Sequence, residues 1–451
     1  MNVTIIGTGY VGLTTGLAFS FIGHKVHCID KNPAIVEKLK AGTMTIHEPG
    51  LEELYQQGKH NLDIRTDIPE LSGQGVVLIA VGTPTKPNGD ADLQYVDAAA
   101  KEVAERIQEG AQLVIVNKST VPIGSAQHVK GIIQRTLAER NVNADIHVAS
   151  NPEFLAEGRA VHDSLYPDRI VIGAESPVAV GILRELYAPL LEQTFTPPKG
   201  TPRPERYTLP PLITTTPTSA ELTKYAANSF LATKISFINE FAGLAERVGA
   251  DITQVARAIG LDTRIGGKFL HAGIGWGGSC FGKDTRAIMT TAQAYDYDMP
   301  IVDAAVSVNK KQRMHVIDRL QKELKVLRGT TIGLLGLAFK GNTDDLRDAP
   351  ALTLIEHLHE RGAVIRVHDP IAIEACRRHY PDLPVEYCED VSCLAMGCDA
   401  LVIVTDWQEY KELPLAEMKA KMRGDYILDA RNLINPGDVE PFGFRYGGIG
   451  R

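Results

Sequence analysis

One cysteine stands at the end of a glycine-rich run and directly before charged residues. The run Gly273-Ile274-Gly275-Trp276-Gly277-Gly278-Ser279-Cys280 is followed by Phe281-Gly282-Lys283-Asp284. The sequence predicts a helix from Asp284 to Ala294, so Cys280 lies near a helix N-terminus, where the dipole and Lys283 favour a thiolate. Asp284 follows by four residues and shares the helix face of the sulfur. A thiolate beside a carboxylate indicates covalent catalysis on a carbonyl; the alternative is a structural cysteine in a tight turn.

A second motif with chemical meaning opens the chain. Val3 to Ile6 predicts a strand, Gly7-Thr8-Gly9-Tyr10-Val11-Gly12 follows it, and Leu13 to Phe21 predicts an apolar helix. This strand–turn–helix setting of G-x-G-x-x-G binds a dinucleotide pyrophosphate at the helix N-terminus. The next predicted strand ends at Asp30, whose carboxylate suits the adenosine ribose hydroxyls and repels a 2′-phosphate. NAD is therefore favoured over NADP, although Lys31 weakens that preference.

The bulk composition limits the classes of function. With 451 residues, 44% hydrophobic and 23% charged, the chain suits a globular enzyme of two or three domains. Its net charge of −8 offers no basic face for nucleic acid or anionic lipid. No segment approaches the roughly 20 apolar residues of a membrane span, and no signal peptide opens the chain, so a cytoplasmic location is expected.

The cysteines give a further expectation. Six scattered cysteines without export signals predict reduced thiols. Cys388, Cys393 and Cys398 are evenly spaced but have no histidine nearby, so partly buried structural thiols are favoured there and no metal site is expected.

The order of predicted elements defines the fold class. Strand-like runs alternate with helical patterns through the first third, which predicts a doubly wound parallel sheet; the runs are Val76 to Val81, Leu113 to Val116, Ile146 to Ala149 and Ile170 to Ile172. The proline-rich stretch Pro197 to Pro217 predicts an exposed loop. Ser219 to Val248 predicts a helix about 45 Å long, suited to a spine or a dimer interface.

A second sheet is predicted after this helix. It begins at Thr331 to Gly336 and continues with Val364 to His368 before Asp369, then with Ala400 to Val404 and Tyr426 to Leu428. The arrangement repeats the opening of the chain, with a strand, glycines and a second strand that ends in aspartate. Lys340 stands where a dinucleotide turn would continue, so a different kind of nucleotide is expected there.

Several motifs in order give the chain a family resemblance. Beside the two glycine motifs they are Val81-Gly82-Thr83-Pro84-Thr85, Lys118-Ser119-Thr120-Val121-Pro122, Asn151-Pro152-Glu153-Phe154-Leu155-Ala156-Glu157-Gly158, Lys224-Tyr225-Ala226-Ala227-Asn228, and Phe339-Lys340 with Arg347. Over nearly its whole length the sequence resembles the UDP-glucose 6-dehydrogenases among the nucleotide-sugar dehydrogenases. The resemblance implies three domains: an NAD-binding Rossmann-like domain at 1–210, a central helical and dimerisation domain with the catalytic cysteine at 211–315, and a UDP-sugar-binding Rossmann-like domain at 316–451.

The resemblance also implies the reaction. A sugar CH₂OH is oxidised to a carboxylate while two NAD⁺ are reduced in succession. This agrees with Cys280, because a thiolate would trap the aldehyde as a thiohemiacetal, which a second oxidation converts to a thioester for hydrolysis. Lys224 and Asn228, four apart on one predicted helix, would stabilise the oxyanion; a solvated helix face is the alternative. Glu153 and Glu157, also at a helical spacing of four, would orient or deprotonate water with Thr120 and Asp284, unless they are a first-turn pair of glutamates.

Binding residues follow from the same resemblance. For NAD the expected residues are Gly7, Gly9, Tyr10, Val11, Gly12, Asp30, Lys31, Thr83, Thr120, Glu157, Lys283 and Arg347. For UDP-glucose they are Glu153, Phe154, Leu155, Lys224, Asn228, Arg264, Lys268, Phe269, Gly273, Lys340 and, less strongly, Arg431. A homodimer through the long helix is implied, with Arg264 reaching toward the partner. The chain departs from the family at Ile35, where a basic residue is common, and in the length of the proline-rich stretch.

Alternatives remain at this stage. GDP-mannose or a UDP-N-acetylhexosamine would be a related substrate; Lys283 directly before Asp284 disfavours the N-acetylhexosamine enzymes but not those for GDP-mannose. A non-catalytic nucleotide-sugar sensor is the alternative from another class. Retention of Cys280, Lys224, Asn228 and Asp284 together argues against a sensor, because binding alone needs no nucleophile.

Overall fold

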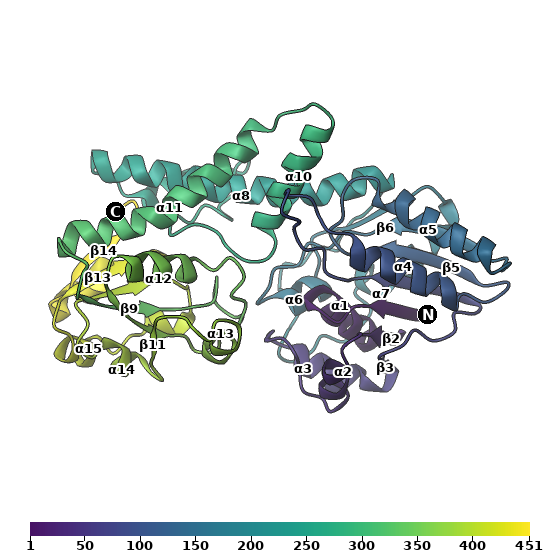
Figure 1. Ribbon diagram of the computed structural model, residues 1–451, viewed down its shortest axis with the longest axis horizontal. Coiled ribbons are helices and arrows are strands. Elements are labelled where there is room, and N and C mark those ends of the chain that lie inside the picture. The colour runs from purple at the N-terminus through teal and green to yellow at the C-terminus, as the bar shows by residue number, and fades with distance from the viewer. The chain divides into compact units, whose positions relative to one another are not determined.

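The chain folds into two compact units (Figure 1). The computed structural model describes residues 1–451. The first unit comprises Met1–Ala227 and Arg286–Tyr295, and the second comprises Asn228–Thr285 and Asp296–Arg451. Two helices, α8 (Pro217–Val248) and α10 (Phe281–Ala294), contribute residues to both units. The expectation of two Rossmann-like sheets joined by a long central helix is confirmed, whereas the three domain boundaries stay a prediction.

The first unit is built on an eight-stranded sheet. Its strand order is β3-β2-β1-β4-β5-β6-β7-β8. The strands are β1 (Asn2–Ile6), β2 (Lys25–Ile29), β3 (Leu62–Arg65), β4 (Gln74–Ile79), β5 (Gln112–Asn117), β6 (Asp145–Ser150), β7 (Ile170–Ala174) and β8 (Leu212–Thr215). The first six follow the doubly wound dinucleotide-binding order, which places the ends of β1, β4 and β5 at one edge.

Two expectations for this sheet were wrong. Strand β7 pairs antiparallel with β6, so the sheet is not parallel throughout. The stretch Pro197 to Pro217 is not only a loop, because it contains β8, which pairs with β7. The side chain of Glu53 also accepts hydrogen bonds from the N–H groups of Lys199 and Gly200 at 2.8 Å each. The proline-rich stretch is therefore packed on the first unit.

Helices cover both faces of this sheet. One buried cluster joins the sheet to α1 (Tyr10–Phe21), α2 (Pro33–Lys40), α3 (Leu51–Gly58), α6 (Ala160–Leu165) and α7 (Pro177–Leu191). The other cluster joins it to α4 (Gln94–Arg106) and α5 (Ser125–Glu139). Alternate residues of β1, β4 and β5 enter opposite clusters, as a sheet buried on both faces requires. Helix α1 begins at Tyr10 rather than at the predicted Leu13.

The second unit repeats the strand order with six parallel strands, in the order β11-β10-β9-β12-β13-β14. They are β9 (Thr331–Leu335), β10 (Val364–His368), β11 (Glu386–Tyr387), β12 (Ala400–Ile403), β13 (Tyr426–Asp429) and β14 (Arg445–Gly448). The helices are α9 (Ile252–Gly260), α11 (Pro300–Leu324), α12 (Pro350–Glu360), α13 (Ile373–His379), α14 (Val391–Ala395), α15 (Leu415–Lys421) and α16 (Pro436–Val439). Its single core cluster also includes Ile238 of α8 and Val316 of α11.

Asp369, after β10, bonds the turn after β9, much as Asp30 after β2 bonds the turn after β1. Its carboxylate accepts the N–H groups of Leu337 and Ala338 at 2.8 and 3.0 Å, and also the indole N–H of Trp407 at 3.1 Å. The carboxylate therefore holds the turn after β9 closed.

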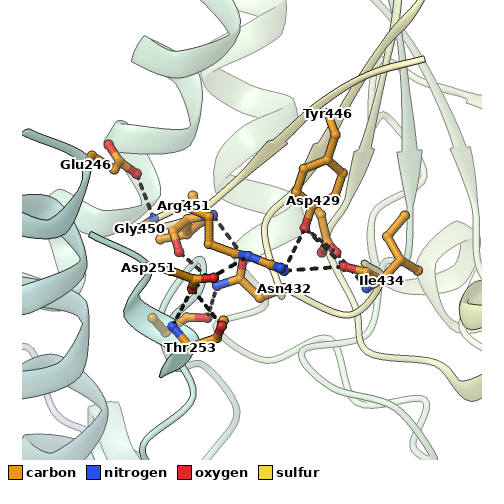
Figure 2. A network of polar contacts seen from close by, with 11 residues as sticks. Glu246, Asp251, Thr253, Asp429, Asn432, Ile434, Tyr446, Gly450 and Arg451 are labelled. Atoms are coloured by element: carbon orange, nitrogen blue, oxygen red, sulfur yellow. Dashed lines mark hydrogen bonds and ion pairs between the residues drawn. The ribbon is translucent and has the colours of Figure 1, made fainter. Parts of the chain in front are cut away.

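The last residues of the chain are anchored to α8 and α9 (Figure 2). Gly450 donates its N–H to Glu246 of α8 at 2.9 Å, and its carbonyl accepts the Ile252 N–H of α9 at 2.9 Å. Asn432 pairs with both backbone groups of Ile449, donating at 2.8 Å and accepting at 3.1 Å. These bonds fix the end of β14 against the central helix within the second unit.

Candidate functional site

The first glycine motif forms a tight turn between β1 and α1. Gly7 has φ +98°, and a Cβ there would lie 2.7 Å from the Ala80 carbonyl oxygen. A Cβ at Gly12 would overlap the Gly7 carbonyl oxygen, whereas a Cβ at Gly9 would have no neighbouring atom within 4 Å. The turn is thus packed tightly behind Gly7 and open at Gly9, which fits close approach of a pyrophosphate to the backbone at the start of α1.

Asp30 lies at the end of β2 and faces this turn. Its Oδ2 accepts hydrogen bonds from the N–H of Thr8 at 3.2 Å and from its hydroxyl at 2.5 Å. Its Oδ1 accepts the Asn32 N–H at 2.9 Å. The carboxylate is therefore oriented by the glycine turn itself. Lys31, beside it, forms an ion pair with Glu102 of α4.

Three distant segments meet at Tyr10. The Tyr10 hydroxyl donates to the carboxylate of Glu48, and the Gly158 N–H reaches Tyr10 Oη at 2.9 Å and Glu48 Oε2 at 2.7 Å. Glu48 is buried, and burial raises its pKa. The start of α1 is therefore bonded directly to the end of the segment 151–158. Elsewhere in this unit, Thr83 donates its hydroxyl to the Thr120 carbonyl at 2.8 Å, which joins the segments after β4 and β5.

A buried ion pair lies at the carboxyl end of the first sheet. Lys224 of α8 donates to Glu153 Oε1 at 2.8 Å, with the two side chains 4% and 7% exposed. Lys118, also buried, follows β5 and donates to Asn151 Oδ1 at 3.0 Å and to the Tyr187 hydroxyl at 3.4 Å. Two lysines and one glutamate thus share a region with little water.

The pKa shifts show how these charges interact. Burial acts to raise the pKa of Glu153, but the Lys224 ammonium, the Leu155 N–H at 2.6 Å and the Lys118 ammonium together lower it. Burial lowers the pKa of Lys118 to about 8, with Glu153 opposing that shift and Lys224 adding to it. Glu153 is therefore a carboxylate at neutral pH and acts as a hydrogen-bond acceptor.

Glu153 and Glu157 lie in a loop after β6, so the suggested helical spacing and the first-turn alternative are both wrong, since α6 begins only at Ala160. Leu155 in this loop donates to Glu153 as described, and Phe154 lies beneath two cations. The Arg169 guanidinium is 3.7 Å from the Phe154 ring centroid, and the Lys224 ammonium is 5.6 Å from it. The loop therefore combines a carboxylate with an aromatic ring and cations.

The second unit holds the cysteine and its acidic neighbour. Cys280 directly precedes α10, and its carbonyl accepts the Asp284 N–H at 2.8 Å, so Cys280 stands at a helix N-terminus as predicted. Its Sγ lies 3.4 Å from Ser279 Oγ. The buried Asp284 carboxylate accepts from Asn228 Nδ2 at 2.6 Å and from Lys283 Nζ at 2.7 Å. Helix α10 starts at Phe281, three residues before the predicted start.

The remaining candidate residues of the second unit are spread more widely. Arg264 pairs with Asp262 at 2.6 Å and is exposed, as is Lys268. The Phe269 ring centroid lies 6.4 Å from that of Phe281, the first residue of α10. Lys340 Nζ lies 5.4 Å from the neighbouring Phe339 ring.

Two arginine candidates have protein partners. Arg347 pairs with Asp345 at 2.7 Å. The guanidinium of Arg431 donates to the carbonyls of Val404, Gly275 and Phe339 at 2.7, 3.2 and 2.7 Å. Arg431 therefore braces three segments of the second unit.

Sequence reasoning overlooked several buried polar residues around these groups. Glu221 of α8 accepts the N–H groups of Gly124 and Ala126 at 2.7 and 3.0 Å, so it caps α5 from another helix. Lys118 and Asn151 belong to motifs of the sequence, but no role was predicted for either residue. Their only signal was a charged or amide residue directly after a buried strand, where sites form in doubly wound sheets.

Comparison with known proteins agrees with this geometry. Residues 1–191 match the NAD binding domain of the UDP-glucose/GDP-mannose dehydrogenase family, residues 218–311 its central domain, and residues 333–436 its UDP binding domain. The UDP-glucose 6-dehydrogenase TuaD of Bacillus subtilis is 43% identical, covering 100% of this chain and 93% of that protein. A UDP-glucose 6-dehydrogenase of Rhizobium meliloti is also 43% identical, with 100% of both chains covered.

Solved structures extend the comparison. The UDP-glucose dehydrogenase of the archaeon Pyrobaculum islandicum has a TM-score of 0.85 at 38% identity, covering 100% of this chain and 97% of that one. A UDP-D-ManNAc dehydrogenase of Pyrococcus horikoshii has a TM-score of 0.83 at 27% identity, covering 100% and 99%. The chain belongs to the UDP-glucose/GDP-mannose dehydrogenase family, and it is accordingly an oxidoreductase with an NAD-type cofactor and a nucleotide-sugar substrate.

Proposed function

We propose that this enzyme oxidises UDP-glucose to UDP-glucuronate in two steps, with Cys280 as the covalent nucleophile. The observation that carries the proposal is the placement of Cys280 at the N-terminus of α10, one helical turn before an Asp284 carboxylate held by Asn228 and Lys283. A dehydrogenase that stops at the aldehyde needs no nucleophile. The relatives named UDP-glucose 6-dehydrogenase, at 37–43% identity over this whole chain, support the choice of sugar.

The cofactor proposed is NAD⁺, held by the turn from Gly7 to Gly12 and by Asp30. The open backbone at Gly9 and the carboxylate oriented by Thr8 fit a pyrophosphate and a ribose diol. When bound, NAD⁺ accepts a hydride from the sugar carbon in each oxidation. Tyr10, Val11, Lys31, Thr83, Thr120, Glu157, Lys283 and Arg347 remain proposed cofactor contacts.

The protein's own groups manage protons and oxyanions. In the first oxidation the C6 hydroxyl loses its proton as the aldehyde forms, and the Lys224 ammonium and Asn228 amide stabilise the negative oxygen. Lys224 is suited to this because its pairing with the Glu153 carboxylate orients a full positive charge in a site with little water.

The cysteine then acts on the aldehyde. Its thiolate forms a C–S bond to the carbonyl carbon, which gives a thiohemiacetal oxyanion that needs the same kind of stabilisation. After the second oxidation the group is a thioester. Water then attacks the thioester carbon, the C–S bond breaks, and the thiolate and the sugar acid are released. Glu153, Glu157, Thr120 and Asp284 are the proposed groups that orient this water or accept its proton.

Substrate contacts are proposed for Phe154, Leu155, Arg264, Lys268, Phe269, Gly273, Lys340 and Arg431. The test of the sugar is direct turnover of UDP-glucose, GDP-mannose and UDP-N-acetylmannosamine under one set of conditions, with the product identified by mass. UDP-glucose should be converted to its acid with the highest kcat/KM. A preference for either other nucleotide sugar would replace the proposed substrate while keeping the chemistry.

A homodimer through α8 is also proposed. One part of this helix in the second unit exposes large apolar side chains, which are Phe230, Phe237, Phe241, Leu244 and Val248. The rings of Phe237 and Phe241 contact each other at an interplanar angle of 41°, with centroids 4.8 Å apart. Exposed apolar side chains gathered in this way are typical of a protein–protein interface. Phe241→Glu should reduce the mass measured by light scattering to that of one chain, while an unchanged mass would remove this helix from the interface.

A further inference from the structure

Side-chain amides hold much of the loop before Cys280, together with backbone hydrogen bonds from Ile274 to Ala430 at 2.7 Å and from Gly278 to Arg347 at 3.0 Å. Gly273 donates its N–H to Asn239 Oδ1 at 2.8 Å, and its carbonyl accepts from Gln312 Nε2 at 2.8 Å. Trp276 donates its N–H to Asn309 Oδ1 at 2.8 Å, and its carbonyl accepts from Asn309 Nδ2 at 2.9 Å. Two residues of one loop thus have both backbone polar groups bonded to amides.

The amides come from two helices of the second unit and lie out of solvent. Asn239 belongs to α8, and Asn309 and Gln312 lie one turn apart on α11. Their exposed fractions are 1%, 3% and 7%. A buried amide that bonds a backbone N–H and the matching C=O replaces the neighbouring strand that the loop lacks. The orientation of the Asn309 amide is fixed, because Trp276 requires an acceptor for its N–H and a donor for its carbonyl.

The loop backbone is packed as closely as it is bonded. Gly275 has φ +100°, and a Cβ there would overlap Asn309 Oδ1. Arg313 of α11 adds a hydrogen bond to the Trp276 carbonyl at 3.0 Å, and the Trp276 indole donates to Ser236 of α8 at 3.2 Å. The segment is therefore constrained at both its backbone and its side chain.

Cys280 follows Trp276 by four residues, and α10 begins directly after Cys280. We infer that Asn309 is a positioning residue for the nucleophile: together with Gln312 it holds the loop so that the sulfur stays at the N-terminus of α10 and in line with the carbonyl it attacks. This inference rests on the proposed role of Cys280. Covalent attack is sensitive to displacements of about 1 Å, so loosening the loop acts on the cysteine steps first.

The test uses two variants that change the amides differently. Asn309→Asp keeps the acceptor for the Trp276 N–H but places a second acceptor against the Trp276 carbonyl. Gln312→Met keeps the volume and removes the donor to Gly273. Gln193→Glu is the matched control, because Gln193 is an equally buried amide, donates to the carbonyls of Leu165 and Leu190, and lies in the first unit.

The main readout separates the two oxidations. Oxidation of the supplied UDP-sugar aldehyde to the acid should fall by up to about a hundredfold in Asn309→Asp, while the first oxidation of UDP-glucose and both KM values change little. Gln312→Met should show a smaller loss of the same kind, and so it tests the inference if Asn309→Asp does not fold. The control should lower the melting temperature without changing the ratio of the two oxidation rates.

A second readout needs no substrate. Alkylation of Cys280 by iodoacetamide should slow in both variants, because a sulfur displaced from the helix N-terminus carries less thiolate. Equal losses in both oxidation rates, or an alkylation rate that is unchanged or raised, would overturn the inference. A wild-type enzyme that makes no acid from UDP-glucose would instead overturn the proposed function, and the alkylation rates would still test the loop.

Discussion

The central ionisable residues of the candidate site each have a polar partner. Lys224 faces Glu153, and Asp284 is bonded by both Asn228 and Lys283. Because a buried charge without a partner is strongly disfavoured, these contacts offset the burial of the side chains. In the proposed reaction, groups held in this way would stabilise a developing oxyanion with little reorganisation.

The role of the cysteine can be separated from that of its neighbours. Cys280→Ser keeps size and hydrogen bonding but replaces a thiolate with a hydroxyl that stays protonated at neutral pH. Formation of the acid should fall more than a hundredfold, about 3 kcal/mol of barrier or more, with binding of substrate and NAD⁺ almost unchanged. Mass spectrometry should detect a covalent sugar adduct on the wild type. Near wild-type turnover by the variant would remove the sulfur from the mechanism.

We attribute the proposed preference for NAD⁺ over NADP⁺ to Asp30. Asp30→Ser should weaken NAD⁺ binding and narrow the gap to NADP⁺, because the variant removes both the ribose acceptor and the charge that repels a 2′-phosphate. Since Asp30 also bonds Thr8, Thr8→Val is the control: it removes the hydroxyl bond and leaves the carboxylate. The measurement is the ratio of the dissociation constants of NAD⁺ and NADP⁺ in each variant. An unchanged ratio in Asp30→Ser would show that Asp30 is a purely structural residue.

At the scale of helices and strands, local patterns in the sequence predicted most elements. Features that depend on pairing between distant segments were predicted poorly. The glycine turn, helix α8 and most strands of both sheets follow from apolar periodicity and turn residues, whereas β3, β8, β11 and β14 were not predicted. The antiparallel direction of β7 and the presence of β8 in a proline-rich stretch depend on pairing between distant segments, which propensity does not encode.

The candidate site divides in the same way. Cys280, Asp284 and Lys283 were found by spacing because they share one helix start. Lys118 contacts Asn151, which lies 33 positions further along the chain. Glu221 caps α5 from about a hundred positions away, so only the folded chain brings these residues together. The helical spacing suggested for Glu153 and Glu157 failed because four residues also fit into a loop.

Lys118, at the end of β5, gives the fold a pH dependence. Its pKa is lowered from 10.5 to about 8, so the unfolded chain binds more protons between these values, and the free energy of unfolding rises with pH across that window. Below about pH 8 the cost of the buried charge is fully present. Relative to Lys118→Met, the wild type should gain up to about 3 kcal/mol between pH 8 and 10.5 in denaturant unfolding. A difference that does not vary with pH would contradict this assignment.

Within the second unit, the connection between the sheet and the central helix depends on the final residues of the chain (Figure 2). Asn432→Asp removes both donors, to Ile449 and to Ala272 at 3.1 Å, and should lower the free energy of unfolding by about 1–3 kcal/mol. Asn435→Asp is the control, because Asn435 is exposed and bonds only Asp438. Equal stability of the two variants in urea would show that the pairing with Ile449 contributes nothing.

For the whole molecule, the central claim is that one active enzyme carries UDP-glucose through both oxidations to the acid. The most direct test is the amount of NADH formed per UDP-glucose consumed at completion, with the product identified by mass. We expect two NADH for each UDP-glucuronate formed and no free aldehyde. One NADH for each UDP-glucose, with the aldehyde accumulating, would contradict it.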